Sequence, residues 1–172
     1  MKNKHFLTQN EYLETDYTAL EGILTFSGQQ NQMLTFQIEE ETYGIEIHKI
    51  KELVRYSPEQ PPKIVPNVPP AIIGVINVRG EVIPVMDLRK KIGLTQRVYG
   101  KFDVIVILKT EKQHLGLLVD EVKDVIPIPK ESAGDVPSYV GKLDISFIKT
   151  LCHGKDGIIA IIDTEHLVCE AE

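Results

Sequence analysis

The residues most able to bind a metal are two cysteines and two histidines in the last third of the chain. Their types suit zinc, which prefers thiolate and imidazole ligands in a tetrahedral set; the four are Cys152, His153, His166 and Cys169. Cys152 and His153 are neighbours at a predicted strand end, where successive side chains point to opposite faces, and Cys169 lies close to the end of the chain. We therefore expect no metal and no cofactor, and interpret these residues as a buried free cysteine and exposed histidines.

Patterns that would support catalysis or phosphate transfer are missing from the sequence. The glycines at 74–80 are not followed by Gly-Lys-Ser/Thr, and no serine lies in a Gly-x-Ser-x-Gly stretch. Neighbouring carboxylates at 39–41 and 120–121 would point to opposite faces of a strand, as in solvated turns. The histidines are scattered, so nothing suggests a phosphate acceptor. We expect a protein that is not an enzyme.

Composition limits the class of partner. The chain of 172 residues is about one domain long, and its 42% apolar content supports a core of ordinary size. The formal net charge is -6 and the basic residues are scattered, which disfavours nucleic acid as a ligand. No apolar run could span a bilayer, the N-terminus has no secretory signal pattern, and two cysteines do not make a disulfide framework. We expect a cytoplasmic protein with no direct membrane insertion.

Short β-branched segments, which are typical of strands, must position any functional residues. They are bounded by Gly, Pro or charged turns and lie at 33–38, 43–47, 71–78, 81–86, 102–108, 115–119 and 157–162. Helix signals are few: a short helix near 48–56, and a turn at 87–93 where Gly93 acts as C-cap. Residues 1–31 are polar and acidic, and we treat them as an N-terminal extension of uncertain order, with 170–172 as a C-terminal tail.

An internal repeat organises the segment from 32 to 169. Placing Gly44 over Gly116 aligns residues 50–54 with 122–126, and a slightly longer offset aligns Arg79 with Lys155 and Asp87 with Asp163. Each half therefore predicts a hairpin, a connection and a second hairpin. Small barrels suit such a pattern because closure removes exposed sheet edges. The repeat therefore predicts a mostly β chain of two small barrel-like subdomains packed as one unit, with a few short helices.

A proline-rich segment at 57–70 connects the two hairpins of the first half. Prolines stiffen such a connection in extended form, and Ile64 and Val65 are expected to anchor it. Asn77 to Gly80 should form the turn of the hairpin that follows, with Gly80 at a positive φ and Arg79 projecting outward. Pro84 then requires an edge or a bulge.

Three blocks of the sequence resemble the CheW family in the order found there. Residues 71–93 resemble its core motif, a Gly-x-x-Asn-x-Arg-Gly stretch followed by an apolar run with Pro and then Asp-Leu. Residues 39–53 resemble the family's first hairpin and the segment after it, and 115–129 resemble the second-half counterpart. The resemblance covers about residues 32–169. It implies two five-stranded SH3-like barrels and no enzymatic activity.

The resemblance also implies partners. Members of this family are cytoplasmic adaptors of bacterial chemotaxis, located at membrane-associated receptor arrays. They link the cytoplasmic tips of chemoreceptors to the regulatory domain of the histidine kinase CheA. A related adaptor of another receptor-kinase pathway, such as pilus motility, is an alternative interpretation. A small ligand-binding barrel is a second alternative of a different class.

Matching motif positions assign roles to individual residues. Ile50, Glu52 and Arg79 resemble receptor-contact residues: an apolar anchor would supply affinity and the charges would set register. Core packing for Ile50, and a solvated charge on a helix for Glu52, are the alternatives. The repeat partners Val122 and Val125 are expected to face the same groove, unless they simply pack in the core.

Tyr139 resembles an aromatic residue used against the kinase. Its alternative role is to cap the barrel. One departure from the family is Thr150, where a glycine is usual.

Overall fold

The computed structural model describes residues 31–171 except 96 and 140. The predicted N-terminal extension, apart from its last residue, lies outside the described residues. In this described part of the chain the structure has ten strands, three 3-10 turns and two short helices. In chain order they are β1 (Gln32–Ile38), β2 (Glu41–Glu46), η1 (Ile47–Lys49), β3 (Ile50–Arg55), β4 (Ile72–Val78), β5 (Glu81–Asp87), α2 (Leu88–Lys91), β6 (Val104–Leu108), β7 (Leu115–Val119), β8 (Glu121–Pro127), η2 (Val136–Ser138), η3 (Ile145–Phe147), β9 (Ile148–Gly154), β10 (Gly157–Ile162) and α3 (Thr164–Cys169).

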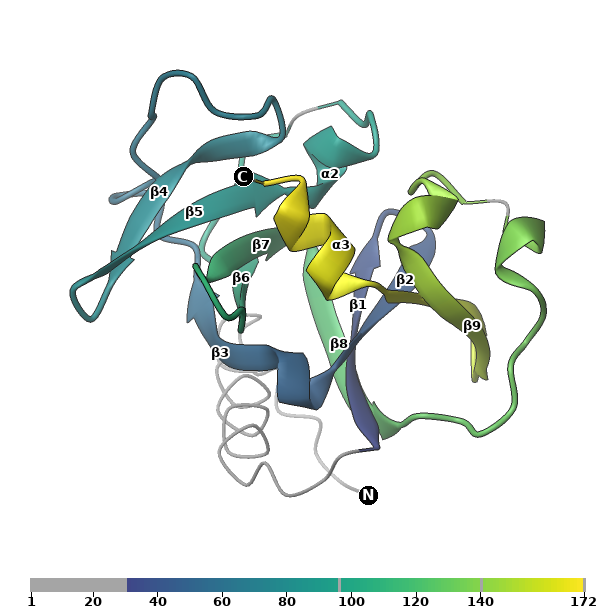
Figure 1. Ribbon diagram of the computed structural model, residues 1–172. Coiled ribbons are helices and arrows are strands. Elements are labelled where there is room, and N and C mark those ends of the chain that lie inside the picture. The colour runs from purple at the N-terminus through teal and green to yellow at the C-terminus, as the bar shows by residue number, and fades with distance from the viewer. Residues whose placement is uncertain (1–30, 96, 140, 172) are drawn as a thin grey trace, which may run out of the picture.

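The strands form two five-stranded sheets that exchange hairpins between the two repeats. One sheet has the order β8-β1-β2-β10-β9 and the other β3-β6-β7-β5-β4. The hairpin β1–β2 of the first repeat thus joins the strands of the second, and β6–β7 joins those of the first. Figure 1 shows the sheet with β4 and β5 at the left and the sheet with β2 and β9 at the right, with α3 at the junction. The predicted mostly β fold with two five-stranded units is confirmed, and each sheet combines strands of both repeats.

Each sheet is an open form of the predicted barrel. The exchanged hairpin contributes one parallel pairing to each sheet, between β2 and β10 and between β5 and β7, and every other pairing is antiparallel. The outer strands, β8 and β9 in one sheet and β3 and β4 in the other, are not neighbours in the hydrogen-bonded order. The repeat extends to the helices: Asp87 caps α2 by accepting from the Lys90 N–H, and Asp163 caps α3 by accepting from the His166 N–H.

One large apolar core joins the two sheets. It contains buried side chains from both, including Leu34, Phe36, Leu53 and Leu117, and Leu167 of α3. Two smaller clusters lie within the individual sheets, one around Ile83, Ile105 and Leu118, and the other around Met33, Cys152 and Ile159. Burial of this shared core makes the two sheets one packed unit.

The helix predicted near 48–56 is wrong, because the segment forms η1 followed by β3. Ile50 and Leu53 are both buried, and a spacing of three is typical of a helix face. In the structure the pairing of β3 with β6 shifts register between Ile50 and Glu52. Such a bulge interrupts the alternation of faces, so both side chains reach the core from a strand. The turn predicted at 87–93 is confirmed by α2, and Gly93 has a φ of 76°.

The region around β4 departs from expectation at Ile64 and agrees with it at Pro84. Ile64 is 89% exposed and does not anchor the proline-rich segment. Pro84 lies in β5, an interior strand of the sheet, but it is locally at an edge, as predicted, because β7 pairs only with Val85–Asp87. It is tolerated because its partner Val75 exchanges both backbone hydrogen bonds with Lys63 instead, at 2.8 Å each. Pro84 and Val75 are thus a non-hydrogen-bonded pair. The backbone nitrogen of Pro84, which has no hydrogen to donate, faces the β7 side of β5. It needs no partner there, because pairing with β7 starts only at Val85.

Gly74, the first glycine of the 74–80 motif, allows the proline-rich segment to lie close to β4, where Lys63 bonds to Val75. Its φ is 151°, and a Cβ built there would lie 2.5 Å from the carbonyl oxygen of Lys63. We expect Gly74→Ala to lower the free energy of unfolding by about 1–3 kcal/mol, because backbone rather than a mobile side chain must move. Urea unfolding measures this. Gly100→Ala is the matched control, since a Cβ there meets nothing within 4 Å; equal losses in both variants would contradict the explanation.

Candidate partner-binding site

The β4–β5 hairpin ends in a tight turn formed by Arg79 and Gly80. Val78 and Glu81 pair directly, and both turn residues have positive φ, 51° for Arg79 and 85° for Gly80. Two positive φ angles give the turn a twist that matches the strands it joins. The Asn77 side-chain oxygen accepts a hydrogen bond from the Gly80 N–H at 2.9 Å and fixes the turn.

Arg79 occupies a backbone conformation that usually belongs to Gly or Asn. The left-handed region costs an ordinary L-residue about 1–2 kcal/mol. The side chain gains no burial in return, since it is 82% exposed. A large cation kept at a strained and exposed turn is an observation that points to function rather than stability.

Glu52 of β3 lies against this turn. Its carboxylate is 3.3 Å from the Arg79 guanidinium and is largely buried, with 17% of the side chain exposed. Beside this pair, Lys51 donates to Glu81 at 2.7 Å. These ion pairs connect β3, an outer strand of the sheet, to the end of the β4–β5 hairpin by side chains. The structure thus brings together two of the predicted site residues, Glu52 and Arg79.

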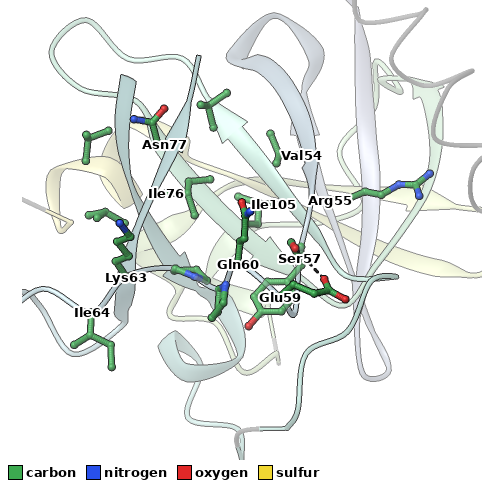
Figure 2. Close-up of a pocket in the computed structure, with 16 residues that line it drawn as sticks. Val54, Arg55, Ser57, Glu59, Gln60, Lys63, Ile64, Ile76, Asn77 and Ile105 are labelled. Atoms are coloured by element: carbon green, nitrogen blue, oxygen red, sulfur yellow. Dashed lines mark hydrogen bonds between the residues drawn. The ribbon is translucent and has the colours of Figure 1, made fainter. Parts of the chain in front are cut away.

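A groove of about 960 Å³ begins at the base of the turn and runs between β3 and the proline-rich segment. Figure 2 shows Val54, Ile76 and Ile105 lining it from three different strands. Lys63 and Glu59 belong to its lining as well. The groove lies between β3 and β4, the two outer strands of the sheet, which do not pair with each other. Its lining is mainly apolar.

The remaining predicted receptor residues are more buried. Ile50 is 2% exposed and belongs to the shared core, which fits the alternative of core packing. Val122 and Val125 lie on β8, in the other sheet from Glu52 and Arg79, and are partly buried against the same core. The β8 strand is an outer strand, so their edge of the sheet is open on one side.

Tyr139 follows η2 and is also partly buried against the shared core. Its hydroxyl donates to the Tyr43 hydroxyl at 3.4 Å, and the Tyr43 hydroxyl donates in turn to Glu41. Burial raises the pKa of Tyr139, so the ring stays uncharged. Gly141 allows its position, because a Cβ at Gly141 would collide with the Tyr139 ring.

The cysteines predicted as metal candidates lie in different environments. Cys152 is buried on β9, where burial raises the pKa of its thiol, and Cys169 is exposed at the end of α3. Within the described part of the chain, no group of three or more His, Cys, Asp or Glu residues could hold a metal ion.

Thr150 of β9 pairs with Ile161 of β10, so a β-branched residue suits the position where the resemblance led us to expect glycine. No helix among the described residues is both long and apolar enough to cross a membrane.

Sequence reasoning missed the charged residues that support the turn. Lys51, Glu81 and His114 come from three separate segments, and nothing in their local sequence indicates that they meet. The sequence does mark the turn itself: Arg-Gly at the centre of a predicted two-residue turn places an arginine where asparagine or glycine is favoured.

Comparison with known proteins identifies relatives of this fold. The family model for the CheW-like domain matches residues 32–172. A chemotaxis protein CheW of Bacillus subtilis is 33% identical over 77% of this chain and 83% of its own length. A chemotaxis protein CheW of Treponema pallidum is 28% identical over 87% of this chain and 88% of its own. The crystal structure of the scaffolding protein TtCheW from Thermoanaerobacter tengcongensis matches with a TM-score of 0.68 and 34% identity, covering 78% of this chain and 85% of that one.

Proposed function

The chain belongs to the CheW-like domain family, and on that basis we propose that it is a non-enzymatic adaptor of bacterial chemotaxis. It couples the cytoplasmic hairpin tip of a chemoreceptor to the regulatory domain of the histidine kinase CheA. Its place is the cytoplasmic side of a membrane-associated receptor array. The names of its relatives, a chemotaxis protein and a scaffolding protein, support this assignment.

The observation that carries the proposal is the strained, exposed Arg79. The receptor hairpin contacts the Arg79 guanidinium and the adjoining Glu52, and this charged pair sets the register of docking. Val122 and Val125 extend the receptor surface onto the second sheet. Ile50 supports β3 from inside the core and does not touch the receptor, because almost none of its surface is exposed.

The kinase uses a different part of the molecule. Tyr139, oriented by Tyr43 and Gly141, presents a partly buried aromatic ring to the regulatory domain of CheA. Such a ring suits a hot spot, since it loses little conformational freedom when it becomes covered. Because each interface is modest in area, signalling relies on many copies held in an array.

Binding measured separately for each partner tests the proposal. In isothermal calorimetry, the purified chain is expected to bind a receptor cytoplasmic hairpin and a CheA regulatory domain from the same organism. Capture from native cells should recover a kinase, and the identity of that kinase distinguishes chemotaxis from another pathway. Saturable binding of a small molecule, with no binding of receptor or kinase, would contradict the proposal.

A further inference from the structure

We propose that Glu81 is a positioning residue for the partner-binding turn, held from two sides by Lys51 and His114. The inference rests on the proposed function in one respect, namely that Arg79 is the group being positioned for the receptor. We call the cluster of Lys51, Glu81 and His114 the brace. It acts on the orientation of the turn rather than on the partner itself.

The brace joins three segments at one carboxylate. Lys51 Nζ of β3 donates to one oxygen of Glu81 at 2.7 Å, and His114 Nδ1, just before β7, lies 2.5 Å from the other oxygen. Both oxygens are therefore engaged, by groups on different sides. Since Glu81 directly follows the turn residue Gly80, fixing its carboxylate fixes the start of β5.

The hairpin needs such support because its end is a two-stranded ribbon. Pairing between β5 and β7 covers only Val85–Asp87, so within the described chain residues 81–84 have a strand neighbour on one side only, in β4. The tip of this hairpin lies at the left edge of the molecule in Figure 1. Isolated two-stranded hairpins are marginal in water, so this ribbon gains its fixed direction from contacts outside the ladder.

Charge order makes the brace specific for one register. Lys51 pairs with Glu81, while the next residue, Glu52, pairs with Arg79. Sliding β3 by one residue against the turn would bring Lys51 toward Arg79 in one direction, or Glu52 toward Glu81 in the other, so like charges would meet in either case. The hydrogen bond from Lys51, then the one from His114, hold the pKa of Glu81 below its usual range. Glu81 is therefore ionised at neutral pH, and the brace is lost only as pH falls through that lowered pKa.

The second repeat has no equivalent brace. In the repeat alignment Gly157 takes the place of Glu81 and Thr42 takes the place of His114. Neither can supply a charged group. The brace is therefore confined to the hairpin that carries Arg79, which matches a role in positioning that arginine and not in the fold shared by both repeats.

The test is a double-mutant experiment on the full chain. Glu81→Gln keeps the side-chain shape and is expected to weaken binding to a receptor hairpin about 3- to 10-fold, since exposed ion pairs are individually weak. The same substitution in an Arg79→Ala background should have no further effect, because the brace acts through Arg79. Glu170→Gln is the control: Glu170 accepts from Lys91 at 2.6 Å, in a pair formed between α2 and the end of α3. Its affinity should be unchanged.

Amide hydrogen exchange of the free protein gives a readout that needs no partner. Glu81→Gln should speed exchange at residues 79–81 relative to wild type and to the control. Unchanged exchange, unchanged affinity, or an equal loss in the Arg79→Ala background would each overturn the inference. Faster exchange in a protein that binds no receptor would support the brace while removing the proposed function.

Discussion

Replacing Arg89 by leucine should lower the free energy of unfolding by about 3 kcal/mol, the cost expected when a buried ion pair loses one partner. Arg89 follows the cap of α2, and its side chain is 9% exposed. It donates to Asp120 at 2.7 Å and to Glu39 at 3.1 Å. Burial opposes the charge of Arg89, but its bonds to Asp120 and Glu39 outweigh burial and raise its pKa. Leucine would remove the shorter of the two cation contacts of Asp120 and leave only Arg97, at 3.2 Å, beside that carboxylate.

The effect should be large because this cluster connects the two sheets. Asp120 lies between β7 and β8, where the chain passes from one sheet to the other, and Glu39 lies in the β1–β2 turn. Urea unfolding measures the loss. Lys149→Met is the control, since Lys149 pairs with Glu46 at 2.8 Å in an exposed position and should cost less than about 1 kcal/mol.

A second substitution separates the mechanism from simple loss of packing. Adding Asp120→Asn to Arg89→Leu removes a carboxylate that then has only the Arg97 contact, and should restore part of the stability. A loss of under about 1 kcal/mol for Arg89→Leu, or no recovery in the double variant, would show that the ion pairs do not hold the sheets together.

Reversing the charge of Arg79 should reduce receptor affinity at least about tenfold while changing the free energy of unfolding by less than about 1 kcal/mol. The exposed side chain contributes little to folding, but Arg79→Glu would place a carboxylate next to Glu52 and repel it. Calorimetry with a receptor hairpin measures the affinity. Affinity for the kinase regulatory domain, which we assign to Tyr139, should stay within twofold.

Arg79→Asn is the companion variant for this experiment. Asparagine tolerates the positive φ better than arginine, so stability should stay equal or rise by up to about 1 kcal/mol. Receptor affinity should fall, because the cation is gone. If either variant unfolds the protein, or if both partners lose affinity together, Arg79 is structural and its assignment as a receptor contact is wrong.

The sequence predicted those features that depend on neighbouring residues. The β4–β5 turn and the helical turn at 87–93 with Gly93 at its end follow from local sequence, and the structure contains both. The bulge in β3 could not be predicted, because it depends on pairing with β6, some fifty residues away, and it made Ile50 and Leu53 look helical. Pro84 was assigned to an edge or bulge and lies at a local edge, but its exact setting, with Val75 bonded to Lys63 and β7 pairing from Val85 on, could not be predicted.

Only part of the candidate site could be predicted from the sequence. The motif singled out Glu52 and Arg79, which the structure brings into contact. It gave no sign that Glu81 meets Lys51 and His114, or that Arg89 meets Asp120, because charged residues pair across any separation that the fold brings together. The motif also does not indicate which side chains are buried. Ile50 was therefore predicted to be a surface anchor, although it lies in the core.

The most direct measurement of the central claim is a bridging experiment with three purified components. A CheA regulatory domain is mixed with receptor hairpins displayed on vesicles, and the amount that sediments with the vesicles is measured with and without this chain. The account predicts sedimentation of the kinase domain only when the chain is present, and its loss with Arg79→Glu. Sedimentation that is independent of the chain, or none at all although each partner binds the chain separately, would contradict it.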